Sequence, residues 1–318
     1  MSNTENIKVA VVDIGSNSVR MNIYEIDEEK NISVLDRRRN ILGLVGYVFN
    51  GNLTPDGEGK LFTVLREYLV IANQIPVERF CVFATASLRA VENSDEVIDK
   101  IYKGLGIKIE IIDGLLEAEY DNIAVINRFN KKLAYPFYVL DMGGGSTEIN
   151  FNYIDRKELH SIPVGSLALS KMFVKNPMHI KKNEYKRIEK YVKDTLLKEI
   201  VPAKDIPRMY VIGGTTRSAS RMCIGERGEK YLKTDGKKYT AFELNQLSQK
   251  LESDNIYARD MVNRYCPDRT TSVLAGIYAF NLIVKILRPK KIISCGNGVR
   301  EGYLDTQIDS ILSESSDI

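Results

Sequence analysis

The chain has 318 residues with 45 Lys or Arg against 42 Asp or Glu, a formal net charge of +3, so a polyanionic ligand must be bound by a local basic patch. Two histidines and four dispersed cysteines (Cys81, Cys223, Cys266 and Cys295) argue against a zinc site and for a reducing compartment. The N-terminus is polar and shows no signal-peptide pattern, and no apolar run approaches the ~18 residues of a membrane span. We therefore expect a soluble cytoplasmic protein.

Hydrophobic periodicity predicts an α/β protein of two domains. In chain order, we expect a strand–turn–strand over 11–24, a helix over 61–72, a strand over 79–84, a helix over 95–105, a strand over 107–112 and a helix over 117–129. After a second strand–turn–strand over 139–152 come a strand over 209–212, helices over 241–251 and 271–287, and a strand over 291–294. We place the N-terminal domain at 1–131 and the C-terminal domain at 132–302, with the segment from about 303 to 318 packing back on the first.

The two strand–turn–strand segments form an internal repeat. Residues 11–18 recur as 139–146 at a constant offset, since 141 − 13 and 146 − 18 both equal 128. Each copy has an apolar run, an aspartate and a small-residue turn before alternation resumes. A duplicated α/β domain, with two hairpins facing each other across a cleft, explains this pattern most simply.

The two turns have the composition of a phosphate-binding loop. Small residues let consecutive backbone N–H groups face an anion, and Ser16, Ser18, Ser146 and Thr147 add hydroxyl donors. Either loop alone could be a simple hairpin turn, but the two copies together favour phosphate binding.

Carboxylates stand beside these loops. Asp13 and Asp141 end apolar strands, where Mg²⁺ bridging a carboxylate and a phosphate would be a natural partner; a hydrogen bond to the local turn is the alternative. Glu148, two residues beyond Ser146, could share the second metal position.

Two further residues follow predicted strands. Glu117, in the first turn of a helix, is either a helix-dipole residue or a catalytic acid or base. Arg89 either holds a phosphate or caps a helix.

Six segments follow one another in the order found in a known family. They are Asp13-Ile14-Gly15-Ser16-Asn17-Ser18-Val19-Arg20, Ala84-Thr85-Ala86-Ser87-Leu88-Arg89, Gly114-Leu115-Leu116-Glu117-Ala118, Asp141-Met142-Gly143-Gly144-Gly145-Ser146-Thr147-Glu148, Gly213-Gly214-Thr215-Thr216-Arg217 and Gly298-Val299-Arg300-Glu301-Gly302. Together they resemble the exopolyphosphatase / guanosine pentaphosphate phosphatase (Ppx/GppA) family, in its short two-domain form. That family belongs to the actin-like, sugar-kinase and Hsp70 ATPase superfamily.

The resemblance implies Mg²⁺-dependent hydrolysis of a terminal phosphoanhydride between two ribonuclease-H-like domains, in a homodimer. Glu117 corresponds to the general base, Asp141 and Glu148 to the acidic metal and water positions, and Arg89 to an arginine that holds substrate phosphates. The positions that match the phosphate loops are Ser16, Asn17, Ser18 and Arg20 in the first, and Gly144, Gly145, Ser146 and Thr147 in the second.

The chain departs from the family pattern at three places. Asp113-Gly114 stands where the family usually has Ser-Gly, and Leu115 and Leu116 stand where it often has acids. Residues 165–168 lack the arginine of a Gly-x-x-Arg segment, which removes one expected phosphate contact. None of these changes removes a residue on which hydrolysis depends.

Two substrates are possible: inorganic polyphosphate, which we favour, and pppGpp, which would be hydrolysed to ppGpp. More distant alternatives are a kinase that binds its nucleotide at Gly213-Gly214-Thr215, and a non-catalytic alarmone sensor. Residues 171–198 hold nine Lys or Arg against three acids, and 37–39 hold three arginines. Either could guide an anionic polymer, although a solvated helix face is the favoured explanation of the longer stretch. We expect no membrane and no specific nucleic-acid partner.

Overall fold

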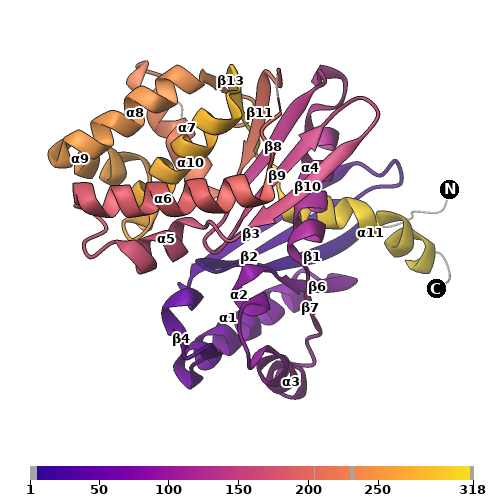
Figure 1. Ribbon diagram of the computed structural model, residues 1–318. Coiled ribbons are helices and arrows are strands. Elements are labelled where there is room, and N and C mark those ends of the chain that lie inside the picture. The colour runs from indigo at the N-terminus through magenta and orange to yellow at the C-terminus, as the bar shows by residue number, and fades with distance from the viewer. Residues whose placement is uncertain (1–5, 204, 230–232, 316–318) are drawn as a thin grey trace. The chain divides into compact units, whose positions relative to one another are not determined.

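The computed structural model describes residues 6–203, 205–229 and 233–315, and it divides into two compact units (Figure 1). The first unit comprises 6–113 and 300–315, and the second comprises 114–299. Helix α4 (Gly114–Phe129) therefore groups with the second unit, whereas the domain boundary after residue 131 stays a prediction. Residues 316–318 of the segment expected to pack back on the first domain lie outside the described residues.

The first unit contains a five-stranded mixed sheet in the order β3-β2-β1-β6-β7. Its strands are β1 (Ile7–Ile14), β2 (Ser18–Ile26), β3 (Ile32–Ile41), β6 (Arg79–Ala84) and β7 (Ile109–Ile111). Strands β1, β2 and β3 form an antiparallel meander, and β6 and β7 extend β1 in parallel. A 3₁₀ turn and a small hairpin follow β3, namely η1 (Leu44–Tyr47), β4 (Val48–Phe49) and β5 (Asn52–Leu53).

Helices cover both faces of this sheet. They are α1 (Pro55–Gln74), α2 (Ala86–Arg89), α3 (Ser94–Leu105) and α11 (Val299–Ser315). Helix α1 begins before the predicted residue 61, because the Thr54 side chain caps it and Pro55 suits its first turn. Helices α1 and α3 pack on the face that carries Val12, whereas α11 covers the opposite face, where the rings of Phe83 and Tyr303 lie 5.0 Å apart.

The second unit contains a six-stranded mixed sheet in the order β10-β9-β8-β11-β13-β12. Its strands are β8 (Phe137–Met142), β9 (Thr147–Asn152), β10 (Lys157–Ile162), β11 (Arg208–Ile212), β12 (Lys238–Thr240) and β13 (Lys291–Ser294). The hairpin of β8 and β9 repeats that of β1 and β2, so the predicted duplication of the two hairpins is confirmed.

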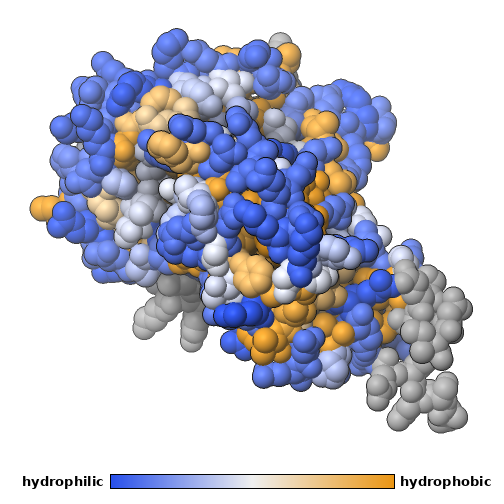
Figure 2. All heavy atoms as spheres, turned by 90° about the horizontal axis from the view of Figure 1, so that it is seen from below, coloured by the Kyte–Doolittle hydropathy of each residue, from blue (hydrophilic) through white to orange (hydrophobic). Residues whose placement is uncertain are grey.

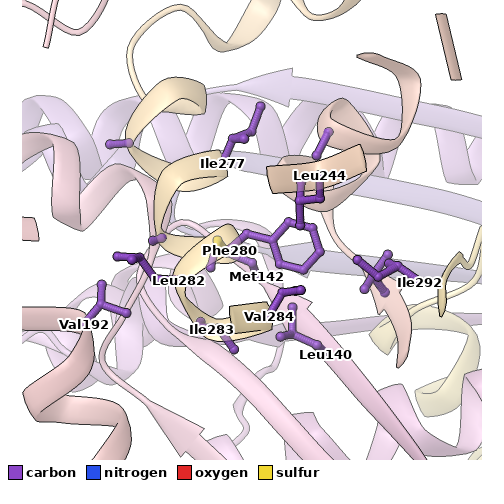
Figure 3. Close-up of a cluster of buried hydrophobic side chains, with 14 of the residues drawn as sticks. Leu140, Met142, Val192, Leu244, Ile277, Phe280, Leu282, Ile283, Val284 and Ile292 are labelled. Carbon is purple, nitrogen blue, oxygen red and sulfur yellow. The ribbon is translucent and has the colours of Figure 1, made fainter. Parts of the chain in front are cut away.

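Helix α10 (Val273–Leu287) forms the centre of the second unit's main core. Its Phe280 and Val284 pack with Leu140 of β8 and with Leu244 of the neighbouring helix α8 (Ala241–Ser253; Figure 3). The opposite face of the sheet is covered by α4, whose Val125 packs against Val139. The other helices and turns are η2 (Asn130–Lys132), α5 (Ser166–Phe173), α6 (Lys182–Glu199), α7 (Gly214–Glu226), α8 (Ala241–Ser253), α9 (Asn255–Tyr265) and η3 (Pro267–Arg269).

The long basic stretch of the sequence forms α6 and the segment before it. One side of α6 is buried in the core through Ile188, Val192 and Leu196. On its exposed side, Lys190 pairs with Asp194 at 2.9 Å and Lys193 pairs with Glu189 at 2.6 Å. These contacts are typical of a solvated helix face, and a role in binding substrate stays a prediction.

Hydrophilic residues cover most of the face shown in Figure 2, and apolar residues reach the surface in smaller patches. Within residues 6–203, 205–229 and 233–315, no helix combines the length and the apolar composition that a membrane crossing needs.

Candidate functional site

The two copies of the repeat form the same tight turn. The Gly15 amide donates to the Ser18 carbonyl at 3.2 Å, and the Gly143 amide donates to the Ser146 carbonyl at 3.0 Å. A Cβ atom on either glycine would lie 3.2 to 3.3 Å from that same oxygen, tighter than an ordinary contact. The repeat therefore conserves the backbone of the loop and not only its composition.

The first loop, Gly15 to Ser18, is held by hydrogen bonds from the residues that follow β3. The Asn17 carbonyl accepts from the amides of Leu42 and Gly43 at 3.1 and 2.9 Å. Arg20 Nε donates to Ser18 Oγ at 3.1 Å, which places the guanidinium beside the loop. These bonds hold the first loop and Arg20 together.

Arg89 lies at the edge of the sheet where the first loop begins. Strands β1, β6 and β7 are parallel, so their carboxyl ends meet at one edge. The Ser87 hydroxyl donates to the Ile14 carbonyl at the end of β1, and Arg89 Nη1 donates to the Ile112 carbonyl at 2.9 Å. The carboxyl edge is the usual place for ligands in α/β sheets.

Asp13 has a cationic partner within the first unit. Its Oδ2 accepts from Arg300 Nη1 at 3.2 Å, and both side chains are largely buried. Burial alone would lower the pKa of Arg300, but the carboxylates of Glu301 and Asp13 outweigh it and raise that pKa. Glu301 Oε1 in turn accepts from the Tyr24 hydroxyl at 2.5 Å. Arg300 thus already balances the charge of Asp13, and the metal-binding role expected for Asp13 stays a prediction.

The equivalent pair in the second unit consists of two acids. Asp141 lies directly opposite Glu148 on β8 and β9, as Asp13 lies opposite Arg20 on β1 and β2. The offset is the same, since 13 + 128 = 141 and 20 + 128 = 148. Glu148 Oε1 also accepts from Ser161 Oγ at 2.8 Å. Opposite residues of an antiparallel pair share one face at close range, so two carboxylates face a common space here.

A glycine turn lies against the Asp141 carboxylate. Strand β11 runs parallel to β8, with Ile212 in register with Asp141, and Gly213 follows with a φ of +92°. A Cβ at Gly213 would lie 2.2 Å from Asp141 Oδ1. This turn begins α7, whose N-terminal N–H groups favour negative charge.

Glu117 lies over the same face of the second sheet. Asn150 Nδ2 donates to the Ala118 carbonyl at 2.7 Å, and Asn150 shares a face of β9 with Glu148. At the other end of α4, the rings of Phe129 and Tyr210 lie 4.8 Å apart. Both contacts lie level with Val139 of β8, so α4 crosses the face of the sheet that carries Asp141 and Glu148, and Glu117 in its first turn is buried.

The second loop is held by the start of α5. The Gly143 and Gly144 carbonyls accept from backbone amides of residues 166–168, each at 3.0 Å, and Gly145 and Ser146 complete the turn. The Thr147 hydroxyl donates to the Val164 carbonyl and is fully buried. The structure thus gives Thr147 a role in holding the loop, and its contact with phosphate stays a prediction.

Arg269 lies against the start of α7, a contact that the sequence did not predict. Its side chain is 9 % exposed, and its Nη2 lies 1.9 Å from where a Cβ on Gly214 would stand, at the start of α7. It is part of the short 3₁₀ turn η3, around which no sequence pattern points to function. The only signal was indirect, since the pair Gly213-Gly214 indicates that another group approaches the backbone closely.

The donor set of the second unit fits Mg²⁺. Mg²⁺ is usually held by one or two carboxylates together with water and substrate phosphates, and Asp141 and Glu148 supply two oxygen donors. Within the described ranges, no group of three or more His, Cys, Asp or Glu is arranged to hold a metal ion.

Two α/β units that each contain a hairpin with the same small-residue turn define a two-domain protein of the actin-like class. The Ppx/GppA phosphatase family model matches residues 22–311, so the chain belongs to the Ppx/GppA phosphatase family. The resemblance found in the sequence is confirmed, and the chain is an enzyme of the class that hydrolyses phosphoanhydride bonds.

The names of individual relatives refer to different activities. Exopolyphosphatase 1 of Mycobacterium bovis is 23 % identical over 96 % of this chain and 89 % of its own length. A guanosine-5'-triphosphate,3'-diphosphate pyrophosphatase of Aliivibrio fischeri is 22 % identical over 98 % of this chain and 61 % of its own length. A bifunctional 3-dehydroquinate synthase/phosphatase of Fusobacterium nucleatum is 29 % identical, and the match spans only 38 % of its length. Among solved structures, the Aquifex aeolicus Ppx/GppA family member has a TM-score of 0.77 and 26 % identity, covering 96 % of this chain and 99 % of its own.

Proposed function

We propose that this protein is an exopolyphosphatase that removes the terminal phosphate of inorganic polyphosphate. The observation that carries this proposal is that Glu117, Asp141 and Glu148 share one face of the second sheet, with Asp141 and Glu148 flanking the Gly143 to Ser146 loop. Such a site supplies a base, a place for a cation and backbone donors for phosphate.

The proposed reaction needs positioning and charge neutralisation more than covalent help. Glu117 accepts a proton from water as the water oxygen attacks the terminal phosphorus and the bridging P–O bond breaks. The products are orthophosphate and a chain shorter by one phosphate. Mg²⁺ held by Asp141 and Glu148 would neutralise charge on phosphoryl oxygens. A carboxylate base suits a protein with only two histidines.

Phosphate binding is assigned to both loops. In the first unit we assign it to Ser16, Asn17, Ser18, Arg20 and Arg89, which gather at the carboxyl edge of the sheet. In the second unit we assign it to Gly144, Gly145 and Ser146, with Thr147 holding the loop from behind.

A pppGpp 5'-phosphohydrolase is the second candidate, because a relative with that type of name matches nearly the whole chain. It would use the same groups with a different leaving group. A cytoplasmic location and a homodimeric state remain predictions.

Phosphate release from polyphosphate, pppGpp and ATP, measured side by side with and without Mg²⁺, tests the proposal. We expect Mg²⁺-dependent release with the highest kcat/KM on polyphosphate. A higher kcat/KM on pppGpp would replace the first candidate by the second. No release from any substrate would contradict hydrolysis and favour a sensor.

A further inference from the structure

Ser161 lies opposite Glu148 at the β10 edge of the second unit's sheet. Strands β8, β9 and β10 form an antiparallel meander, in which Asp141 is in register with Glu148 and Glu148 is in register with Ser161 (Figure 1). Directly opposite residues of antiparallel strands share a face, so these three side chains form one row across the sheet. Along this row, the Ser161 hydroxyl donates to Glu148 Oε1 at 2.8 Å.

The same row in the first unit has a different composition. There Asp13 is in register with Arg20, and Arg20 is in register with Arg39 on β3. Arg39 and Ser161 therefore occupy the same place in the two meanders. Since the first unit has a long cation at this place, the geometry of the strands does not by itself dictate the short hydroxyl of the second.

Ser161 fixes one oxygen of a buried carboxylate without adding a positive charge beside it. Glu148 is only 1 % exposed, and a carboxylate buried so deeply needs polar contacts. A lysine or an arginine would supply such a contact as an ion pair and would compete with a bound cation, whereas a hydroxyl supplies direction alone. Lys157, four residues before Ser161 on the same face of β10, pairs instead with Glu119 of α4.

We propose that Ser161 is a positioning residue, which orients the Glu148 carboxylate toward the space that it shares with Asp141, where Mg²⁺ would bind. This rests on the proposed function, which assigns Mg²⁺ to Asp141 and Glu148. Groups that hydrogen-bond a metal ligand set its orientation, and their loss typically weakens metal binding about 10- to 100-fold. A hydrogen bond that served folding alone would contribute to stability and leave the affinity for Mg²⁺ unchanged.

Isothermal titration calorimetry with Mg²⁺, on the protein without substrate, tests this role. We expect Ser161→Ala to raise the Kd for Mg²⁺ about tenfold, and Ser161→Thr, which keeps the hydroxyl, to stay within about twofold of wild type. Ser170→Ala is the matched control and should leave this Kd unchanged, because the Ser170 hydroxyl also lies in the second unit but donates to the Thr271 carbonyl. Urea denaturation of each variant checks that it is folded.

A double-mutant cycle shows whether Ser161 acts through Glu148. Because Glu148→Gln removes the carboxylate that the hydroxyl orients, Ser161→Ala should weaken Mg²⁺ binding no further in that background. A full additional loss there, or equal losses in Ser161→Thr and Ser161→Ala, would overturn the positioning role.

The same titrations separate this role from the proposed function. A Kd for Mg²⁺ that Glu148→Gln raises and Ser161→Ala leaves unchanged would overturn the positioning role alone. A Kd that neither variant changes would contradict the proposed Mg²⁺ site itself, and the positioning role with it.

Discussion

Asp13 and Asp141 occupy equivalent places in the duplicated hairpins, but the residues opposite them carry opposite charges. Arg20 faces Asp13, and Glu148 faces Asp141. The first acid is balanced within the protein by arginines, whereas the second shares its space with another acid. The two hairpins thus differ in charge at an equivalent position, which fits the proposed direct phosphate contact in the first copy and the proposed Mg²⁺ site in the second.

We predict that Mg²⁺ binds between the carboxylates of Asp141 and Glu148. Asp141→Asn and Glu148→Gln should each raise the Kd for Mg²⁺ at least about tenfold, because each removes one of two carboxylate donors. Isothermal titration calorimetry of the protein without substrate measures this directly. A Kd for Mg²⁺ unchanged in both variants would mean that the metal binds elsewhere.

Asp13 should behave differently from Asp141. Asp13→Asn takes one of two carboxylates, those of Asp13 and Glu301, away from the buried Arg300, so we expect a loss of about 3 kcal/mol in the free energy of unfolding. Its Kd for Mg²⁺ should stay at the wild-type value. Urea denaturation and calorimetry check the two halves of this prediction. If Asp13→Asn instead weakens Mg²⁺ binding as Asp141→Asn does, Asp13 is a metal ligand, as the sequence analysis predicted.

We predict that activity depends on the missing side chain of Gly213 and not only on its positive φ. Gly213→Ala and Gly228→Ala both place an alanine at positive φ, +92° and +79°, which costs about 1 kcal/mol. Only at Gly213 would the new Cβ meet the Asp141 carboxylate, whereas Gly228 has open space. We expect Gly213→Ala to lower kcat at least about tenfold and Gly228→Ala to leave it unchanged. Similar kcat values in the two variants would show that Asp141 tolerates displacement.

The sequence predicted the parts of this fold that local patterns encode. The repeat identified both loops, and strands such as 79–84 and 291–294 were found because they are apolar runs. The start of α1 was missed because its first turn depends on the cap at Thr54 rather than on periodicity. Arg269 and Arg300 could not be found as partners, since each reaches its contact from a distant part of the chain.

Glu184 should make stability depend on pH. Its carboxylate accepts from the backbone amides of Lys181 and Lys175 at 2.8 and 3.1 Å. Burial would raise the pKa of Glu184, but these bonds lower it below its ordinary value. A carboxyl with a lower pKa in the folded state stabilises the protein at neutral pH, and that stabilisation is lost as pH falls through the folded pKa.

Glu184→Gln should therefore reduce the free energy of unfolding by about 1 kcal/mol at pH 7, and the difference from wild type should shrink below about pH 4. Asp194→Asn, which removes an exposed carboxylate from the same helix, serves as the control with little effect. Denaturation curves of both variants across this pH range test the prediction. Equal free energies of unfolding for Glu184→Gln and Asp194→Asn would contradict a stabilising role for the Glu184 carboxylate.

The central claim is that Glu117 is the base that activates water. The most direct measurement is the rate of phosphate release from polyphosphate by Glu117→Gln, with Glu119→Gln as control. Glu119 lies on the same helix but pairs with Lys157 on β10. We predict at least a ~100-fold loss of kcat in Glu117→Gln and an unchanged kcat in Glu119→Gln. A Glu117→Gln variant that turns over polyphosphate at the wild-type rate would contradict the account.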